Sequence, residues 1–371
     1  MEHFEEYKKQ GEPEKLQKAE NWGIAIGLQQ VDNLIPSKYL IEVAKDNIEG
    51  KISIDEAGEQ VSQYYKKNPA KTLKEHNEKE ADEVSARIAK LLSTHTFSFS
   101  PAELISIHKA LFSGIFDDEI AGKIRTYDIT KKEPILNGDT VIYGRADSIM
   151  ETLDYDFEQE KKFNYKGLSK REKVERLAKF TSGIWQIHPF GEGNTRATAV
   201  FIIKYLYTLG FVTNNDLFEQ NSKYFRNALV RANYQNLNQD IYYTMEYLNK
   251  FFGNLLLGEK NLLDNREMQI KTISETNDVL KSKEKSKEKS KEKSKEKSKE
   301  KSKEKSKEKS KEKILQIIAN NPYITTRELS EITGLSIAGV EKNMRQMKEK
   351  GLIRRIGPDK GGHWEVLNDQ K

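Results

Sequence analysis

Nine consecutive residues combine the groups that a phosphate-handling site needs. They run from His188 to Arg196 and read His-Pro-Phe-Gly-Glu-Gly-Asn-Thr-Arg. His188, with an ordinary pKa of about 6.5, can accept a proton from a hydroxyl at neutral pH. Glu192 is a hard oxygen ligand suited to Mg²⁺, and Arg196 can direct two N–H donors onto phosphate oxygens. Gly191 and Gly193 allow a turn with inward N–H groups, so the run predicts a site that handles nucleotides.

Predicted helices flank this run on both sides. Upstream, Ser169 and Glu172 form a capping-box pattern, and apolar residues recur at helical spacing as far as Trp185. Downstream, residues 198–209 are almost wholly apolar and end at Gly210. We therefore expect a loop that opens a buried helix, whose unpaired N–H groups and positive dipole end attract phosphate.

Each residue of the run also has a structural interpretation. A lone histidine is usually structural, a Gly-x-Gly turn is usually only a turn, and Glu192 could merely complement a helix dipole. The functional interpretation rests on coincidence, because all four kinds of group occur in order at one loop-to-helix junction.

The run resembles the defining motif of the Fic domain family, His-Pro-Phe-x-(Asp/Glu)-Gly-Asn-x-Arg. The resemblance implies a mainly α fold, with a helical Fic core and a β-hairpin flap. It also implies transfer of AMP from ATP to a Ser, Thr or Tyr hydroxyl of a protein. By this resemblance His188 is the general base, Phe190 a core anchor and Glu192 the Mg²⁺ ligand. The implied nucleotide-binding residues are Gly191, Gly193, Asn194, Thr195, Arg196, Tyr224 and Asn227.

Two positions depart from the family pattern. Many members have Gly or Lys where Thr195 stands, and Lys marks a branch that phosphorylates with an inverted nucleotide, so Thr195 favours nucleotidylation. A second Arg commonly lies three positions after Arg196, where this chain has Ala199. In the family that Arg holds the γ-phosphate or pairs with a Glu of an inhibitory helix. Its absence predicts weakened or altered autoinhibition.

Residues 135–143 predict a β-hairpin, because Asn137 to Asp139 lies between short apolar runs. In the family, a hairpin flap at this place aligns the target segment by strand addition. Ile135, Leu136 and Asn137 are the implied target-docking residues. An ordinary surface hairpin is the alternative.

Residues 1–66 predict helices and resemble the antitoxin-like unit that precedes many Fic domains. Lys45 to Tyr65 is expected to form two helices joined at Gly50, with Ser53 and Glu56 capping the second. A packing subdomain without regulatory function is the alternative.

The family's inhibitory signature is (Ser/Thr)-x-x-x-Glu-(Gly/Asn), and two segments match it in part. Residues 28–33 have Asp32 in place of the Glu, whereas residues 45–50 retain Glu49 but lack the hydroxyl. Asp32 and Glu49 are therefore the candidate inhibitory carboxylates.

A low-complexity segment explains the chain's basic character. The tetrad Ser-Lys-Glu-Lys repeats eight times from Ser282 to Lys313 and carries a charge of +8, whereas the whole chain carries +5. The remainder is therefore −3. This basicity indicates a spacer and does not predict that the folded parts bind nucleic acid.

The C-terminal residues resemble a winged helix-turn-helix. Helices are predicted at 314–320, 325–334 and 336–350, and strands at 352–356 and 363–367. Such domains bind DNA or dock on proteins, and both alternatives stay open here. The basic residues that would meet DNA phosphates are Lys342, Arg345, Lys348, Arg354, Arg355 and Lys360.

The predicted organisation is a regulatory segment at 1–66, a Fic domain at 67–262, a charged linker at 263–313 and a small α+β winged helix at 314–371. No apolar run approaches the roughly 18 residues of a membrane span, and the sequence has no cysteine. A cytoplasmic protein without a membrane partner is expected.

Three hypotheses follow. The first is a Mg²⁺-dependent transferase that moves AMP from ATP to a protein hydroxyl, the chain itself included. The second is a DNA-binding regulator whose Fic domain senses nucleotide or is inactive. The third is a Fic-type transferase of another nucleotide or of a phosphate group.

Overall fold

The computed structural model describes residues 3–211, 216–270, 311, 313–319, 321–356 and 363–367. It separates into two compact units, Met1–Ile270 and Lys271–Lys371. The predicted Ser-Lys-Glu-Lys spacer lies outside the described residues apart from Lys311 and Lys313.

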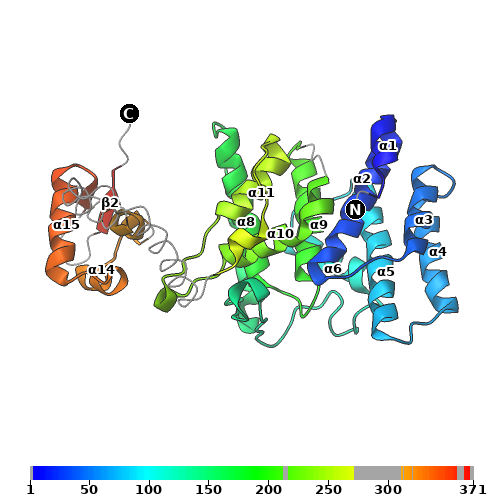
Figure 1. The fold of residues 1–371 in the computed structure, drawn as a ribbon, viewed down its shortest axis with the longest axis horizontal. Helices are drawn as coiled ribbons and strands as arrows, with labels where there is room; N and C mark the ends of the chain where they lie inside the picture. The colour runs from blue at the N-terminus through cyan, green and yellow to red at the C-terminus, as the bar shows by residue number, and fades with distance from the viewer. Residues whose placement is uncertain are drawn as a thin grey trace, which may run out of the picture. The chain divides into compact units, whose positions relative to one another are not determined.

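Helices make up the first unit (Figure 1). Its α-helices are α1 (Glu5–Gln10), α2 (Pro13–Gly27), α3 (Lys38–Ile48), α4 (Ile54–Lys67), α5 (Leu73–Ser93), α6 (Pro101–Phe112), α7 (Ile149–Lys162), α8 (Lys170–Ile187), α9 (Asn194–Thr208), α10 (Asp216–Ala232) and α11 (Glu246–Leu257). Its short 3-10 helices are η1 (Leu28–Asp32), η2 (Pro134–Leu136), η3 (Ala146–Ser148), η4 (Leu237–Gln239) and η5 (Asn265–Met268). The prediction of a mainly helical fold is confirmed.

Local capping explains where several helices begin. Ser53 and Glu56 form a reciprocal capping box at the start of α4, and Ser169 and Glu172 do the same for α8. Gly50 adopts a left-handed φ of 78° between α3 and α4. These helix boundaries confirm the sequence prediction.

The N-terminal helices and the helices around the motif share one hydrophobic core. α2 packs against α5 and α10, and α4 packs against both α3 and α5 (Figure 1). One core cluster runs from Phe4 to Ile270. The predicted segments 1–66 and 67–262 thus belong to one unit, which brings the N-terminal helices against the motif.

α9 is the central helix that the motif opens. Residues 194–206 are all buried, and the helix packs against α5, α6 and α8. A helix that is apolar on every side must be covered on every side. The loop before α9 is therefore held inside the unit.

The flap segment differs from the predicted β-hairpin. The chain does reverse at Asn137 and Gly138, whose φ values are 53° and 88°. The structure describes no paired strands between residues 130 and 145, and the turn is the 3-10 helix η2 instead. Pro134 lacks a ladder N–H, and the backbone N–H of Lys131 donates to the Thr140 hydroxyl rather than to a carbonyl. The flap is a reversing loop held by mixed hydrogen bonds.

The second unit has the predicted winged-helix elements. Residues 313–319 are helical and precede α14 (Thr326–Thr333) and α15 (Ile337–Glu349). Strands β1 (Ile353–Ile356) and β2 (His363–Val366) pair antiparallel, with Ile353 opposite Val366. The predicted wing turn at 357–362, including Lys360, lies outside the described residues.

Candidate functional site

The motif joins α8 to α9 through a left-handed residue at each end. His188 ends α8 with φ 52°, a conformation uncommon for a residue other than glycine, and Gly193 precedes α9 with φ 73°. A Cβ on Gly193 would lie 2.5 Å from the Phe112 ring. Gly193 is therefore required both for its backbone angle and for the closeness of α6.

The tautomer of His188 follows from its surroundings. Nδ1 lies 3.3 Å from the carbonyl oxygen of Trp185. Because a carbonyl only accepts, Nδ1 carries the proton and Nε2 presents a lone pair. Nε2 is buried and has no hydrogen-bond partner among the described residues. His188 thus holds an unused proton acceptor inside the unit.

Burial keeps His188 in its basic form. Desolvation, followed by the positive charge of Lys131, holds the pKa of His188 well below its usual value. The Tyr143 ring of the flap lies 4.2 Å from the His188 ring, centroid to centroid. Since Nε2 is fully covered, a hydroxyl can reach it only after neighbouring side chains move.

Glu192 faces the flap through an ion pair. Its carboxylate lies 3.0 Å from the Lys131 ammonium and is 57% exposed. Among the described residues, no group of three or more His, Asp or Glu side chains is arranged to hold a metal ion. A single carboxylate fits Mg²⁺ that arrives with a nucleotide, because Mg²⁺ commonly takes its other ligands from phosphates and water.

Arg196 is held by three side chains from the N-terminal part of the chain. Its Nη1 donates to Gln29 Oε1 at 3.0 Å, and its Nη2 donates to Glu80 Oε1 at 2.6 Å. Its Nε lies 2.9 Å from Asp32 Oδ2, without the alignment of a hydrogen bond. The guanidinium is 98% buried and also lies over the Phe112 ring. The group predicted to bind the outer phosphates is therefore occupied.

The two candidate inhibitory carboxylates lie in different places. Asp32 ends η1 and contacts Arg196, whereas Glu49 accepts from the Tyr7 hydroxyl and pairs with Lys51. Ala199 is fully buried in α9. Asp32 thus contacts Arg196, the first arginine of the family pattern, whereas the position of the second arginine is Ala199.

Two polar side chains of the motif close the loop on itself. Asn194 Oδ1 accepts from the backbone N–H of Phe190, and its Nδ2 donates to the carbonyl of the same residue. Thr195 accepts from the indole N–H of Trp185 at 3.0 Å. Phosphate contacts from these two residues would therefore come from their backbone N–H groups at the start of α9.

The two candidate adenine-pocket residues lie on α10. Tyr224 is 1% exposed and donates to the carbonyl of Tyr247, and Asn227 donates to Asn265 Oδ1 at 2.7 Å. Neither partner belongs to the motif. Adenine binding by Tyr224 and Asn227 stays a prediction.

Arg125 is a motif-holding residue that sequence reasoning missed. Its buried guanidinium donates to the carbonyls of Ile187, His188, Tyr127 and Gly144. It therefore ties the motif loop to the base of the flap. An isolated arginine in a polar segment gives no sequence signal of this kind.

His108 was also missed, because nothing near it in the sequence marks it. Its ring stacks on Phe190 at 3.7 Å, and its Nδ1 accepts from the backbone N–H of Gly122. Nε2 therefore carries the proton and donates to the carbonyl of Glu192 at 2.9 Å. Burial lowers the pKa of His108 to about 4, so the ring is neutral and fixes the backbone of the motif loop.

The candidate docking residues of the flap are not freely exposed. Ile135 and Leu136 are buried, and the carbonyl of Ile135 accepts from the backbone N–H of Ile270. Asn137 donates to the carbonyl of Ile270 and accepts from Gln269. Residues 265–270, which we call the strap, therefore cover this edge of the flap. A target cannot pair with Ile135 in this conformation.

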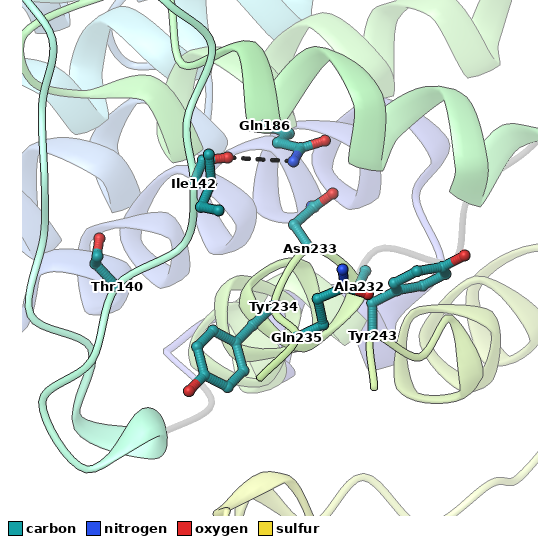
Figure 2. Close-up of a pocket in the computed structure, with 8 residues that line it drawn as sticks. All are labelled: Thr140, Ile142, Gln186, Ala232, Asn233, Tyr234, Gln235 and Tyr243. Carbon is teal, nitrogen blue, oxygen red and sulfur yellow. Dashed lines mark hydrogen bonds between the residues drawn. The ribbon is translucent and has the colours of Figure 1, made fainter. Parts of the chain in front are cut away.

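The other leg of the flap borders an open groove of about 400 Å³. Figure 2 shows Ile142 and Gln186 joined by a hydrogen bond on one side of it. The lining residues are Thr140, Ile142, Gln186, Ala232, Asn233, Tyr234, Gln235 and Tyr243.

The predicted DNA-facing residues of the second unit divide into two sets. Lys342, Arg345 and Lys348 are exposed on α15, opposite its buried Val340, Met344 and Met347. On the strands, Arg354 pairs with Glu365, and Arg355 stacks on Trp364. Glu341 and Glu349 are exposed on the same helix, so its exposed face carries both signs of charge, and phosphate contacts by its basic residues stay a prediction.

Two family models match segments of the chain. Residues 98–206 match the model of the Fic/DOC family, and residues 307–354 match that of a winged helix-turn-helix described as DNA-binding. No curated protein matches the chain.

Solved structures from Bartonella and Desulfovibrio resemble the chain. A BepC protein from Bartonella tribocorum, solved with bound AMPPNP, is 22% identical, with 51% of this chain and 90% of that chain covered and a TM-score of 0.40. A Fic family protein from Desulfovibrio desulfuricans G20 is 13% identical, with 98% and 91% covered and a TM-score of 0.43.

The chain contains a Fic/DOC family domain at residues 98–206 and a winged helix-turn-helix at residues 307–354. Members of the Fic family commonly transfer AMP to proteins. Among the described residues, we find no helix with the length and apolar content that spanning a bilayer requires.

Proposed function

We propose that this protein transfers AMP from ATP to a hydroxyl of a protein target, with His188 as general base. The observation that carries the proposal is the unpartnered Nε2 lone pair of His188, which lies in a loop that opens a buried helix. A neutral imidazole can take a proton, and a helix start attracts phosphate. The complete motif from His188 to Arg196 supports the same chemistry.

In the proposed reaction the target hydroxyl attacks the α-phosphorus of ATP. The new oxygen–phosphorus bond forms as the bond from the α-phosphorus to the bridging oxygen breaks, and pyrophosphate leaves. The hydroxyl proton passes to Nε2 of His188. Bound Mg²⁺, held by Glu192 and the phosphates, would neutralise the charge of the phosphate oxygens. Backbone N–H groups from Gly193 to Thr195 would orient the phosphates, since phosphoryl chemistry is mainly positioning and charge stabilisation.

We also propose that the N-terminal contacts on Arg196 make this conformation an inhibited one. The guanidinium must leave Gln29, Asp32 and Glu80 before it can bind an outer phosphate. Two carboxylates beside it also repel an incoming polyphosphate. The missing arginine at Ala199 therefore alters autoinhibition, because the inhibitory contacts meet Arg196 instead.

Labelled ATP tests the transfer directly. The purified full chain is incubated with Mg²⁺ and α-labelled ATP, with His188→Ala as the control variant and γ-labelled ATP in parallel. We expect label from α-labelled ATP only, and none in His188→Ala. Equal labelling of the variant, or label from γ-labelled ATP alone, would contradict AMP transfer.

A DNA-binding regulator is the second candidate function. The winged-helix match and the exposed Lys342, Arg345 and Lys348 of α15 favour it. Mobility shifts with duplex DNA at rising salt test it, with Arg345→Ala as the variant. Because phosphate contacts release counterions, Arg345→Ala should weaken binding and reduce its salt dependence. Unchanged binding would remove α15 from the interface.

A further inference from the structure

We propose that Arg226 of α10 supplies a second guanidinium for the outer phosphates of ATP, beside Arg196. This inference rests on the proposed AMP transfer and adds a binding residue that lies outside the motif. The position of the family's second arginine is Ala199, which is fully buried in α9 and has no polar side-chain atom. The second guanidinium therefore comes from a different helix.

Arg226 lies on the face of α10 that meets η1. The two elements pack together, and Lys223, one turn before Arg226, donates to Asn33 Oδ1 at 3.3 Å. Asp32 ends η1 directly before Asn33, and its carboxylate lies 2.9 Å from Arg196 Nε. The same short segment of chain therefore lies against both arginines.

A buried ion pair holds the Arg226 guanidinium in place. Its Nη1 donates to Glu133 Oε2 at 2.6 Å, and its Nη2 donates to Glu133 Oε1 at 3.1 Å. The Tyr143 hydroxyl also donates to Glu133, and the Tyr143 ring lies 4.2 Å from the His188 ring, centroid to centroid. Burial disfavours the charge of Arg226, but the bonds to Glu133 and the charges of Glu133 and Asp32 raise its pKa. Arg226 is therefore charged and close to both the candidate base and the Asp32 carboxylate.

The ion pair leaves Arg226 able to bind a further anion. A guanidinium has five N–H groups, and the bidentate pair uses two of them. The Arg226 side chain is 20% exposed, whereas that of Glu133 is fully buried. A phosphate can therefore reach N–H groups of Arg226 that Glu133 does not use, without breaking the pair.

The Asp32 carboxylate marks the place that the outer phosphates would take. It is an anion that both Arg196 and Arg226 attract, so a polyphosphate that displaces it meets two guanidinium forks. AMP has no outer phosphates with which to reach them. The arrangement therefore favours a nucleoside triphosphate over a monophosphate, and Arg226 contributes to that preference.

The preference for a triphosphate over a monophosphate tests this role. The full chain is titrated by calorimetry in Mg²⁺ with AMP and with an ATP analogue that has methylene in place of the α,β-bridging oxygen, so that no transfer occurs. Arg226→Gln should lower the ratio of the Kd for AMP to the Kd for the analogue about tenfold. Arg226→Lys should lower it about threefold, because an ammonium keeps the charge but lacks the fork.

Two control variants separate phosphate binding from other effects. Glu133→Gln keeps a hydrogen-bond acceptor for Arg226 but weakens the tie between α10 and the flap. Lys223→Gln removes one positive charge from the same face of α10. Neither variant should lower the ratio.

Three results overturn the assignment. They are a wild type that binds the analogue no more tightly than AMP, a wild-type ratio in both Arg226 variants, and an equal loss in Glu133→Gln, which would mean that Arg226 only holds the flap. Arg226→Lys decides the test where Arg226→Gln does not fold. Failure of the proposed AMP transfer looks different, because the wild type would then bind the analogue with this preference but take no label from α-labelled ATP.

Discussion

Glu80 should restrain nucleotide binding more than Asp32 does. Its carboxylate lies 2.6 Å from Arg196 Nη2, is 21% exposed and makes an aligned hydrogen bond. Such a charge-assisted bond contributes about 1.5–3 kcal/mol, whereas a neutral amide in its place retains about 1 kcal/mol. Glu80→Gln should therefore lower the cost of freeing Arg196 by about 1.4 kcal/mol, which is about tenfold in the Kd for ATP.

Asp32 gives a smaller expected effect. Its carboxylate is 39% exposed and is not aligned with the guanidinium as a hydrogen bond. Water screens such a pair, so Asp32→Asn should change the free energy of ATP binding by about 0.5 kcal/mol, roughly twofold in Kd. The two effects share Arg196 and need not add.

Calorimetric titration of the full chain with ATP and Mg²⁺ measures these constants at one ionic strength. Glu49→Gln is the matched control, because Glu49 contacts Tyr7 and Lys51 instead of Arg196. Its Kd should equal that of wild type. If Glu80→Gln folds normally but binds ATP no more tightly than wild type, the contacts on Arg196 do not compete with nucleotide.

Three further predictions concern pH and the flap. The transfer rate should stay level from pH 8 down to about 6.5 and fall only at lower pH, because the pKa of His188 lies well below its usual value. Initial rates that halve near pH 7 would contradict this. The pKa of His108 is about 4 in the folded chain, so below about pH 6.5 the unfolded chain binds more protons than the folded chain. The free energy of unfolding therefore decreases as the pH is lowered. Urea unfolding should show about 2 kcal/mol less stability from this residue at pH 5 than at pH 7.5, and His108→Gln should lose that difference. The double variant Asn137→Gly with Gln269→Ala removes the side-chain hydrogen bonds between the flap and the strap. Amide hydrogen exchange at residues 131–144 should therefore be about tenfold faster than in wild type. Arg266→Ala, on the same strap, should leave this exchange unchanged.

Local sequence signals were sufficient for most of the helices and for the motif's place in the fold. Ser53 with Glu56 and Ser169 with Glu172 cap their helices within one turn, so neighbouring residues alone decide where α4 and α8 begin. The apolar run after residue 197 likewise required a buried helix, and α9 is one. In each case the physical cause is a hydrogen bond or a periodicity that spans only a few residues.

Contacts between distant residues decided the state of the site. Gln29 and Glu80 meet Arg196 across 167 and 116 residues, and no spacing rule connects them. Packing also separated Asp32 from Glu49, although the sequence offered both as inhibitory carboxylates. The flap, a reversing loop rather than a strand pair, is bonded at its outer edge to Ile270, a residue 135 positions further along. Whether His188, Glu192 and Arg196 are free to bind a ligand therefore depends on neighbours distant in the sequence, which only the folded chain brings together.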